Sequence, residues 1–315
     1  MTKSNKKVIE NINIEGLPVS IYYDMSNLMI RYAYVMYSQL ADNAFTDWGL
    51  FKHGVISNIL DFKKYFEGKP EIVLAYDKKK DGIYWRNKVS EYYKAHRGEW
   101  TSNIPKDVLF SEFDDLYNGM KECFPWKSFK MPGIEADDII AVLVQKHKGT
   151  KNQIVVSGDG DFQQLIDEHT YVYNPIKHQL MTHMDVDANR LRFDKIMKGD
   201  SGDGVSSYLD DEDTVVNPHK RRKPIRTAKL TEMYEVCCTR GWEGVYETYL
   251  PSKEMKSKVE LNCLLVDMRK IPVIVSDRIL NEYNSYQTEA SANTAMKYLS
   301  SRRLRELIER IEEII

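Results

Sequence analysis

The stretch NQIVVSGDGDFQQL, residues 152–165, joins a run of β-branched residues to two aspartates in a glycine-containing turn. The same pattern, a β-branched or aromatic run that ends in aspartate, occurs in VSIYYD (19–24) and EIVLAYD (71–77). Such runs predict strands. Helical patterns, with apolar residues at intervals of three and four, lie at about 27–40 and 50–66. Strands that alternate with helices at this spacing predict an α/β fold with a central, mostly parallel sheet flanked by helices.

The predicted strands all end in an aspartate, namely Asp24, Asp77 and Asp159. In open α/β sheets, ligands bind beyond the carboxyl ends of the strands, so we expect these carboxylates to converge at one edge. Two further acidic motifs are GIEADD (133–138), at the start of a predicted helix, and KGDSGDG (198–204). Taken alone, each motif also fits a structural role, because acids favour the first turn of a helix and Asp–Gly pairs favour turns.

Together, the acidic motifs indicate a metal site, because converging negative charge is destabilising unless cations neutralise it. No candidate ligand is His or Cys, so we expect a hard cation, Mg²⁺, with Mn²⁺ as a substitute. The candidate ligands are Asp24, Asp77, Glu135, Asp137, Asp138, Asp159, Asp161, Asp200 and Asp203.

Charge is segregated along the chain, although 45 Lys and Arg nearly balance 47 Asp and Glu overall. Residues 78–106 carry eight basic and three acidic side chains, with aromatic residues among them. Residues 219–229, the basic block, carry six basic side chains and no acid. Basic segments around an acidic centre are typical of a metal-dependent nuclease, in which Lys and Arg bind phosphates while carboxylates bind cations.

We expect two regions, an α/β nuclease core at 1–183 that includes residues 78–106, and a helical region at 184–315. The β pattern fades after about residue 184, and short helical patterns follow. The longest apolar run, 139–144, is far shorter than the ~20 residues of a membrane-spanning helix. The four cysteines lack CxxC spacing, which disfavours a zinc site and a disulfide framework. A cytoplasmic monomer without a membrane partner is expected.

Six motifs, in this order and spacing, carry a family resemblance: YYDMSN, LAYD, YWRNKVSEYYKAHRG, GIEADDIIAVL, VVSGDGDFQQL and KGDSGDGV. Over about residues 19–230 the chain resembles the bacterial and bacteriophage 5′-nuclease family, which comprises flap endonucleases and 5′→3′ exonucleases. The resemblance implies a PIN-like nuclease core with a helical arch and a helical C-terminal region.

The resemblance also implies roles for individual residues. One Mg²⁺ would be bound around Asp24, Asp77, Glu135, Asp137 and Asp159. A second Mg²⁺ would be bound by Asp161, Asp200 and Asp203, with Asp138 as a helper. The helical arch would match residues 83–97, where Arg86 and Lys94 fall on catalytic, phosphate-contacting positions. Expected nucleic-acid-binding residues are Tyr84, Trp85, Tyr92, Tyr93 and Arg97 in the arch, and Lys220, Arg221, Arg222, Lys223, Arg226 and Lys229 in the basic block.

The sequence departs from the family pattern after KGDSGDG. The family's usual glycine-containing helix–hairpin–helix is replaced by an acidic run at 209–213, which we expect to be a solvated loop. The basic block follows, so the duplex-binding segment is predicted to be remodelled. Near the C-terminus, Leu304, Leu307 and Ile311 are among the apolar residues on one face of a predicted helix at 296–315, which is expected to pack on the core.

The function implied by this resemblance is a Mg²⁺-dependent 5′→3′ exonuclease and flap endonuclease. It would remove RNA primers and 5′ flaps from RNA–DNA and DNA–DNA duplexes in phage DNA replication. Expected partners are flap, forked or nicked DNA, the RNA–DNA duplex, and, from the family, a single-stranded-DNA-binding protein and a sliding clamp. Two alternatives stay open: a PIN-like ribonuclease, which also gathers acids at strand ends, and a non-catalytic DNA-junction-binding replication accessory protein.

Overall fold

The computed structural model describes residues 16–39, 48–66, 68–97 and 104–314. A six-stranded sheet in the order β3-β2-β1-β4-β5-β6 forms its centre. Neighbours from β3 to β5 are parallel, and β6 is antiparallel to β5, which confirms the predicted mostly parallel sheet. The strands are β1 (Val19–Asp24), β2 (Glu71–Tyr76), β3 (Lys127–Lys130), β4 (Asn152–Val156), β5 (Thr170–Asn174) and β6 (Gln179–Met181).

The central strands are buried on both faces of the sheet. Because successive side chains of a strand point to opposite faces, Ile21 and Tyr23 of β1 join one hydrophobic core while Tyr22 joins the other. The five residues of β4 are all buried. Burial on both faces explains why these segments are nearly continuous apolar runs rather than alternating patterns.

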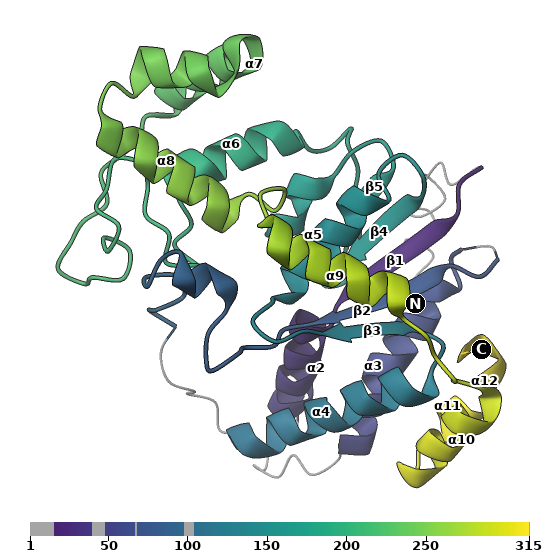
Figure 1. Ribbon diagram of the computed structural model, residues 1–315. Coiled ribbons are helices and arrows are strands. Elements are labelled where there is room, and N and C mark those ends of the chain that lie inside the picture. The colour runs from purple at the N-terminus through teal and green to yellow at the C-terminus, as the bar shows by residue number, and fades with distance from the viewer. Residues whose placement is uncertain (1–15, 40–47, 67, 98–103, 315) are drawn as a thin grey trace.

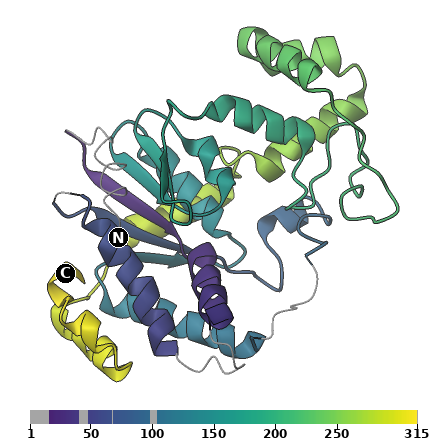
Figure 2. The same ribbon diagram turned by 180° about the vertical axis from the view of Figure 1, so that it is seen from behind.

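Helices cover both faces of the sheet, as Figures 1 and 2 show from opposite sides. The helices on one face are α2 (Met25–Gln39), α3 (Trp48–Lys63), α4 (Lys106–Cys123) and α10 (Ala292–Ser301). The helices on the other face are α5 (Ala136–Lys146) and α9 (Val273–Ser285). Within the described ranges, no helix combines the length and apolar character needed to cross a membrane.

Three helices lie beyond one end of the sheet, at the top of Figure 1. They are α6 (Ala188–Lys198), α7 (Thr227–Tyr249) and α8 (Lys253–Val266). Together with Tyr93 they form a third hydrophobic cluster. The following helices, α9 and α10, pack back on the two main cores. The division at residues 183 and 184 stays a prediction.

The predicted single helix at 296–315 is wrong. Three helices occupy the described part of this segment: the end of α10, then α11 (Arg305–Ile308) and α12 (Ile311–Ile314), whereas residue 315 lies outside the described residues. Arg303 has a φ of 60°, in the left-handed region that a right-handed helix cannot continue through. Leu304 and Leu307 are nonetheless buried, so the apolar pattern reflects packing on the core across three short helices.

Candidate active site

Three aspartates at or just after strand ends, Asp24, Asp77 and Asp159, lie near one another at the carboxyl edge of the sheet. Asp24 is the last residue of β1, where it accepts hydrogen bonds from the backbone of Asn27 at 3.1 Å and from Ser157 Oγ at 2.9 Å. Asp77 follows β2 and accepts a 2.7 Å hydrogen bond from the backbone of Ala136, the first residue of α5. The end of β2 is thereby joined to the start of α5.

The start of α5 supplies three more carboxylates. Glu135 is the N-cap, and its side chain and that of Asp138 form a capping box. Capping satisfies backbone N–H groups that have no partner inside the helix, and acids in this turn interact favourably with the helix dipole. Glu135 and Asp138 are buried, while Asp137 is half-buried.

Burial and mutual repulsion make several of these carboxylates hard to ionise. Burial, together with the nearby carboxylates of Asp77 and Asp159, raises the pKa of Asp24 from 3.8 to about 7. Burial also raises the pKa of Asp137, and Asp24 adds to the effect. Burial raises the pKa of Asp161 to about 6 despite the opposing effect of Lys195. Such a group of carboxylates favours any bound cation that offsets its charge.

Asp161, Asp200 and Asp203 form a compact half-buried group. One carboxylate oxygen from each lies within 4.8 Å of the others, a spacing that a single metal ion can bridge. Asp161 is in the 3₁₀ helix η2 (Gly160–Leu165), and Asp200 follows α6. No comparable group is formed by the ligands predicted for the first metal within the described ranges.

Two glycines allow the loop around Asp200 and Asp203 to close. Gly199 has a φ of 70°, and a Cβ there would lie 2.3 Å from the carbonyl oxygen of Val205. Asp200 and Val205 exchange two backbone hydrogen bonds of 2.8 Å across this loop. A Cβ on Gly204 would lie 2.4 Å from the carbonyl oxygen of Tyr92, so this glycine lets residues 78–97 approach the loop. The glycines of KGDSGDG therefore position the acids as well as forming a turn.

Lys195 is a member of this site that the sequence motifs did not identify. Its Nζ donates to Asp161, and to Oδ2 of Asp200 at 2.5 Å. Burial alone would raise the pKa of Asp200, but Lys195 lowers it below its ordinary value. The available signal was the spacing of Lys195, five residues before Asp200, among the short helical patterns that follow residue 184.

Arg86 and Lys94, the predicted catalytic residues, both contact the acids. Arg86 is buried, and it donates from Nη1 to Glu135 and from Nη2 to Asp138, each at 2.8 Å. Lys94 donates to Glu135, and its Nζ lies 3.7 Å from Oδ1 of Asp203. Burial alone would raise the pKa of Glu135, but these two cations lower it.

The segment predicted as a helical arch is not a continuous helix. Within the described residues 83–97, the 3₁₀ helix η1 (Trp85–Lys88) is followed by turns, and Lys94 has a φ of 55°. Residues 98–103 of the basic segment lie outside the described residues. The positive φ of Lys94 cannot continue a right-handed helix, and the backbone N–H of Lys94 instead donates to the carbonyl oxygen of Asp203 at 2.8 Å.

The predicted nucleic-acid-binding residues of this segment differ in exposure. The indole Nε1 of Trp85 donates to Asp138 at 2.8 Å, and the hydroxyl of buried Tyr93 donates to Asp203 at 3.2 Å. These two rings therefore support the carboxylates. Tyr84 and Tyr92 are half-exposed, and Arg97 is exposed and pairs with Asp203 at 2.8 Å.

The basic block contacts the acidic run before it. Lys220 pairs with Asp211 at 2.9 Å and with Asp213 at 2.6 Å. Asp210 is buried and accepts hydrogen bonds from Ser207 and from the backbone of Lys223, so the expectation that the whole run is solvated is wrong. The carboxylate of Asp210 thereby provides a partner for the Ser207 hydroxyl and for the backbone N–H of Lys223.

The rest of the basic block lies near the carboxylates or faces solvent. Arg222 donates to the carbonyl oxygen of Lys198 at 2.7 Å, two residues before Asp200. Arg221, Arg226 and Lys229 are exposed, with no hydrogen bond or ion pair to another described side chain.

Sequence comparisons connect this arrangement to known proteins. A family model for the 5′-3′ exonuclease N-terminal resolvase-like domain matches residues 21–193, and one for the T4 RNase H C-terminal region matches 186–314. Ribonuclease H of enterobacteria phage T4 is 29% identical over 228 residues, 70% of this chain and 72% of that protein. A 5′-3′ exonuclease of Buchnera aphidicola (subsp. Acyrthosiphon pisum) is 32% identical over 136 residues, 43% of each chain.

Two solved structures share the fold at low sequence identity. The bacteriophage T5 D15 protein co-crystallised with metal ions has a TM-score of 0.61 at 17% identity, over 83% of this chain and 97% of that one. The T5 D15 flap endonuclease in a pseudo-enzyme–product complex with DNA and metal ions has a TM-score of 0.59 at 17% identity, over 92% and 98%. The first family model covers more than half of the chain, including the strand-end aspartates and the first turn of α5. The predicted resemblance is thereby confirmed, and the chain belongs to the 5′-3′ exonuclease family.

Proposed function

We propose that this protein is a Mg²⁺-dependent 5′→3′ exonuclease and flap endonuclease. Its substrates would be RNA primers and 5′ flaps on RNA–DNA and DNA–DNA duplexes, and its role would be in phage DNA replication. Family membership also supports a single-stranded-DNA-binding protein and a sliding clamp as partners, without assigning contacts.

The observation that carries this proposal is the convergence of carboxylates from separate segments of the chain. Asp24, Asp77 and Asp159 come from three strand ends, and the other acids come from α5, η2 and the loop after α6. Carboxylate oxygen donors suit Mg²⁺ or Mn²⁺ better than softer cations. We assign the first ion to Asp24, Asp77, Glu135, Asp137 and Asp159, and the second to Asp161, Asp200 and Asp203, with Asp138 as a helper.

When bound, a pair of such cations would supply an activated water and stabilise the leaving 3′-oxygen in an in-line displacement. Lys94 would then contact the scissile phosphate, because its ammonium lies between Glu135 and Asp203 and retains part of its exposure. Charge already placed where negative charge develops lowers the barrier without reorganisation. Buried Arg86 would hold Glu135 and Asp138 in position.

The half-exposed rings of Tyr84 and Tyr92 would stack on unpaired bases of the 5′ strand, an interaction that every base can make. Exposed Arg97 would contact its phosphates. On the duplex side, Arg221, Arg226 and Lys229 would supply phosphate contacts without sequence preference.

A product-length assay tests this proposal. Flap, nicked and RNA-primed substrates, each labelled at the 5′ end, would be incubated with Mg²⁺ or with EDTA. With Mg²⁺, and not with EDTA, we expect intact flaps to be released and short 5′-phosphorylated products to form from the primer. Tight binding of all three substrates without cleavage would identify a non-catalytic accessory protein. Cleavage of single-stranded RNA without need for a duplex would identify a PIN-like ribonuclease.

A further inference from the structure

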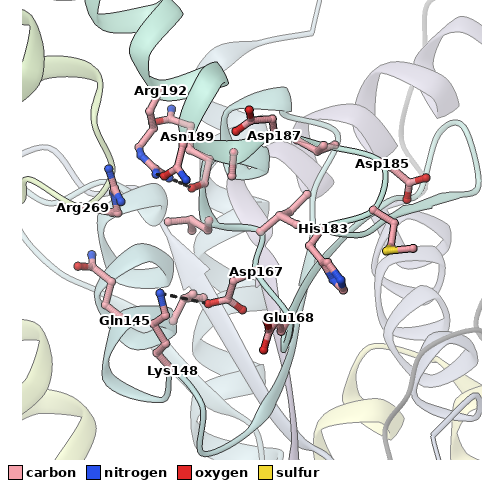
Figure 3. A pocket seen from close by; sticks show the side chains of 17 residues that line it. Gln145, Lys148, Asp167, Glu168, His183, Asp185, Asp187, Asn189, Arg192 and Arg269 are labelled. Atoms are coloured by element: carbon pink, nitrogen blue, oxygen red, sulfur yellow. Dashed lines mark hydrogen bonds and ion pairs between the residues drawn. The ribbon is translucent and has the colours of Figure 1, made fainter. Parts of the chain in front are cut away.

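A cavity of about 610 Å³ lies apart from the candidate metal ligands, none of which lines it. Its walls come from the end of α5, the end of η2, residues 166–168, residues 183–187 and the start of α6. Figure 3 shows Arg192 and Arg269 near one another on one side of this cavity, with Lys148 and Asp167 below them. The volume is within the range of about 300–1,000 Å³ that is typical of small-molecule sites.

Arg192 is a buried cation without an anionic partner. Its side chain is 5% exposed, yet no carboxylate of the described chain lies within ion-pair distance. The guanidinium donates to the carbonyl oxygen of Gln164 at 2.5 Å and to Asn189, while its Nε and both polar atoms of the Gln164 amide have no hydrogen-bond partner. Burial, and then the charge of Arg269, lowers the pKa of Arg192 to about 10. A buried charge of this kind is costly unless something pairs with it.

Of the four acids in the cavity wall, Glu168 is exposed and the other three are engaged elsewhere. Asp167 pairs with Lys148 at 3.6 Å, and Asp185 accepts hydrogen bonds from the backbone and hydroxyl of Thr182. Asp187 caps α6 and accepts a hydrogen bond from Tyr234. Arg269 is exposed and is 3.4 Å from Asp267. At this end of the cavity Arg269 is therefore paired with Asp267, whereas Arg192 has no carboxylate within ion-pair distance.

We propose that this cavity binds a nucleotide-sized phosphate monoester. Guanidinium groups match the geometry of phosphate oxygens, so Arg192 and Arg269 would bind the phosphate. A free phosphate ion would fill only a small part of the volume. The rest of the wall includes Leu165, Ile166 and Val186, which suit an apolar or aromatic body attached to the phosphate.

Isothermal titration calorimetry on the full chain in EDTA tests this site, because the chelator prevents phosphate from binding through divalent cations at the carboxylates. AMP would be compared with adenosine, which lacks the phosphate, with inorganic phosphate, and with the diester ApA. We expect saturable binding of AMP, with each of the other three probes weaker by about tenfold or more.

Arg192→Met and Arg269→Met should each weaken AMP binding by about tenfold or more. Arg190→Met is the matched control, because Arg190 is on the same helix, pairs with Asp194 and does not line the cavity. It should bind AMP like the unmodified protein. Arg269 is exposed, so its variant decides the question if Arg192→Met fails to fold.

Four outcomes would overturn the proposal. Absence of AMP binding would do so, as would unchanged AMP affinity in the Arg269→Met variant. Equal affinities for AMP and adenosine would show that the phosphate is not recognised. If ApA bound as tightly as AMP, or tighter, the ligand would be a nucleic-acid strand rather than a free monoester.

Discussion

Nζ of Lys195 lies 2.5 Å from Oδ2 of Asp200, near the end of α6. The same ammonium contacts Asp161, so one side chain links two of the three carboxylates that lie within metal-binding distance of each other. A divalent cation bound to Asp161 and Asp200 would therefore compete with this lysine.

Replacing Lys195 by Met should strengthen Mn²⁺ binding at the site formed by Asp161, Asp200 and Asp203, because the competing ion pair is removed. For a pair of this partial exposure we expect about fivefold, or roughly 1 kcal/mol. Calorimetric titration with Mn²⁺ measures the change. Lys198→Met is the control, since Lys198 pairs with Asp194 at 2.7 Å on the same helix. If Lys195→Met bound Mn²⁺ more weakly than this control, Lys195 would be a positioning residue rather than a competitor.

Replacing Lys94 by Ala should slow the chemical step by about 10²-fold with little change in substrate affinity, if its ammonium acts mainly on the transition state. Single-turnover cleavage of a flap at saturating enzyme gives the rate, and a binding titration in Ca²⁺ gives the affinity. Lys88→Ala removes an exposed charge from the same segment and serves as the control. A defect confined to affinity would assign Lys94 to substrate binding alone.

Within the basic block, exposed Arg221 should contribute more to duplex binding than Lys220, which already pairs with Asp211 and Asp213. Arg221→Ala should reduce the slope of log K against log salt by about 0.9 if it removes one phosphate contact. Lys220→Ala should change the slope less. Binding of one duplex at several salt concentrations measures both variants. Equal slopes in Arg221→Ala and the unmodified protein would place the duplex contact elsewhere.

The raised pKa of Asp24 predicts that the protein in EDTA is destabilised as pH rises. The carboxyl titrates near 3.8 when unfolded and near 7 when folded, so the folded state binds the proton more tightly. This contribution to stability is fully present below about pH 4 and is lost as pH rises to about 7. The midpoint of thermal unfolding should fall as pH rises from 4 to 8, and the Asp24→Asn variant should show a smaller fall. An equally steep decline in that variant would contradict the assignment to Asp24.

The sheet and its acidic edge could be predicted from sequence because each depends on short-range patterns. Continuous apolar runs mark strands buried on both faces, and parallel strands place Asp24, Asp77 and Asp159 at a common edge. The GIEADD motif marks a helix start through capping. Strands β3, β5 and β6 were not predicted. In β3, KSFK, two lysines interrupt the apolar pattern, and the pairing with β2 is a tertiary contact.

The inward ion pairs could not be predicted, because they depend on which charges the fold brings together. Arg86 is near Glu135 only after the segment 83–97 folds over α5, and Lys195 meets Asp161 only when α6 packs on η2. The burial of Asp210 depends in the same way on Lys223 returning to it from the basic block. The metal, catalytic and nucleic-acid roles of these residues stay predictions.

The most direct test of the account is cleavage by the double variant Asp159→Asn/Asp161→Asn, since Asn keeps the side-chain shape and removes the charge that would bind the cations. Single-turnover cleavage of a 5′-labelled flap with Mg²⁺ would be compared with Asp107→Asn/Asp114→Asn, which neutralises two exposed acids on α4. We predict that the first variant loses at least about 10³-fold in rate while still binding the flap, and that the second is unchanged. Cleavage by Asp159→Asn/Asp161→Asn at the rate of the unmodified protein would contradict the metal-dependent site.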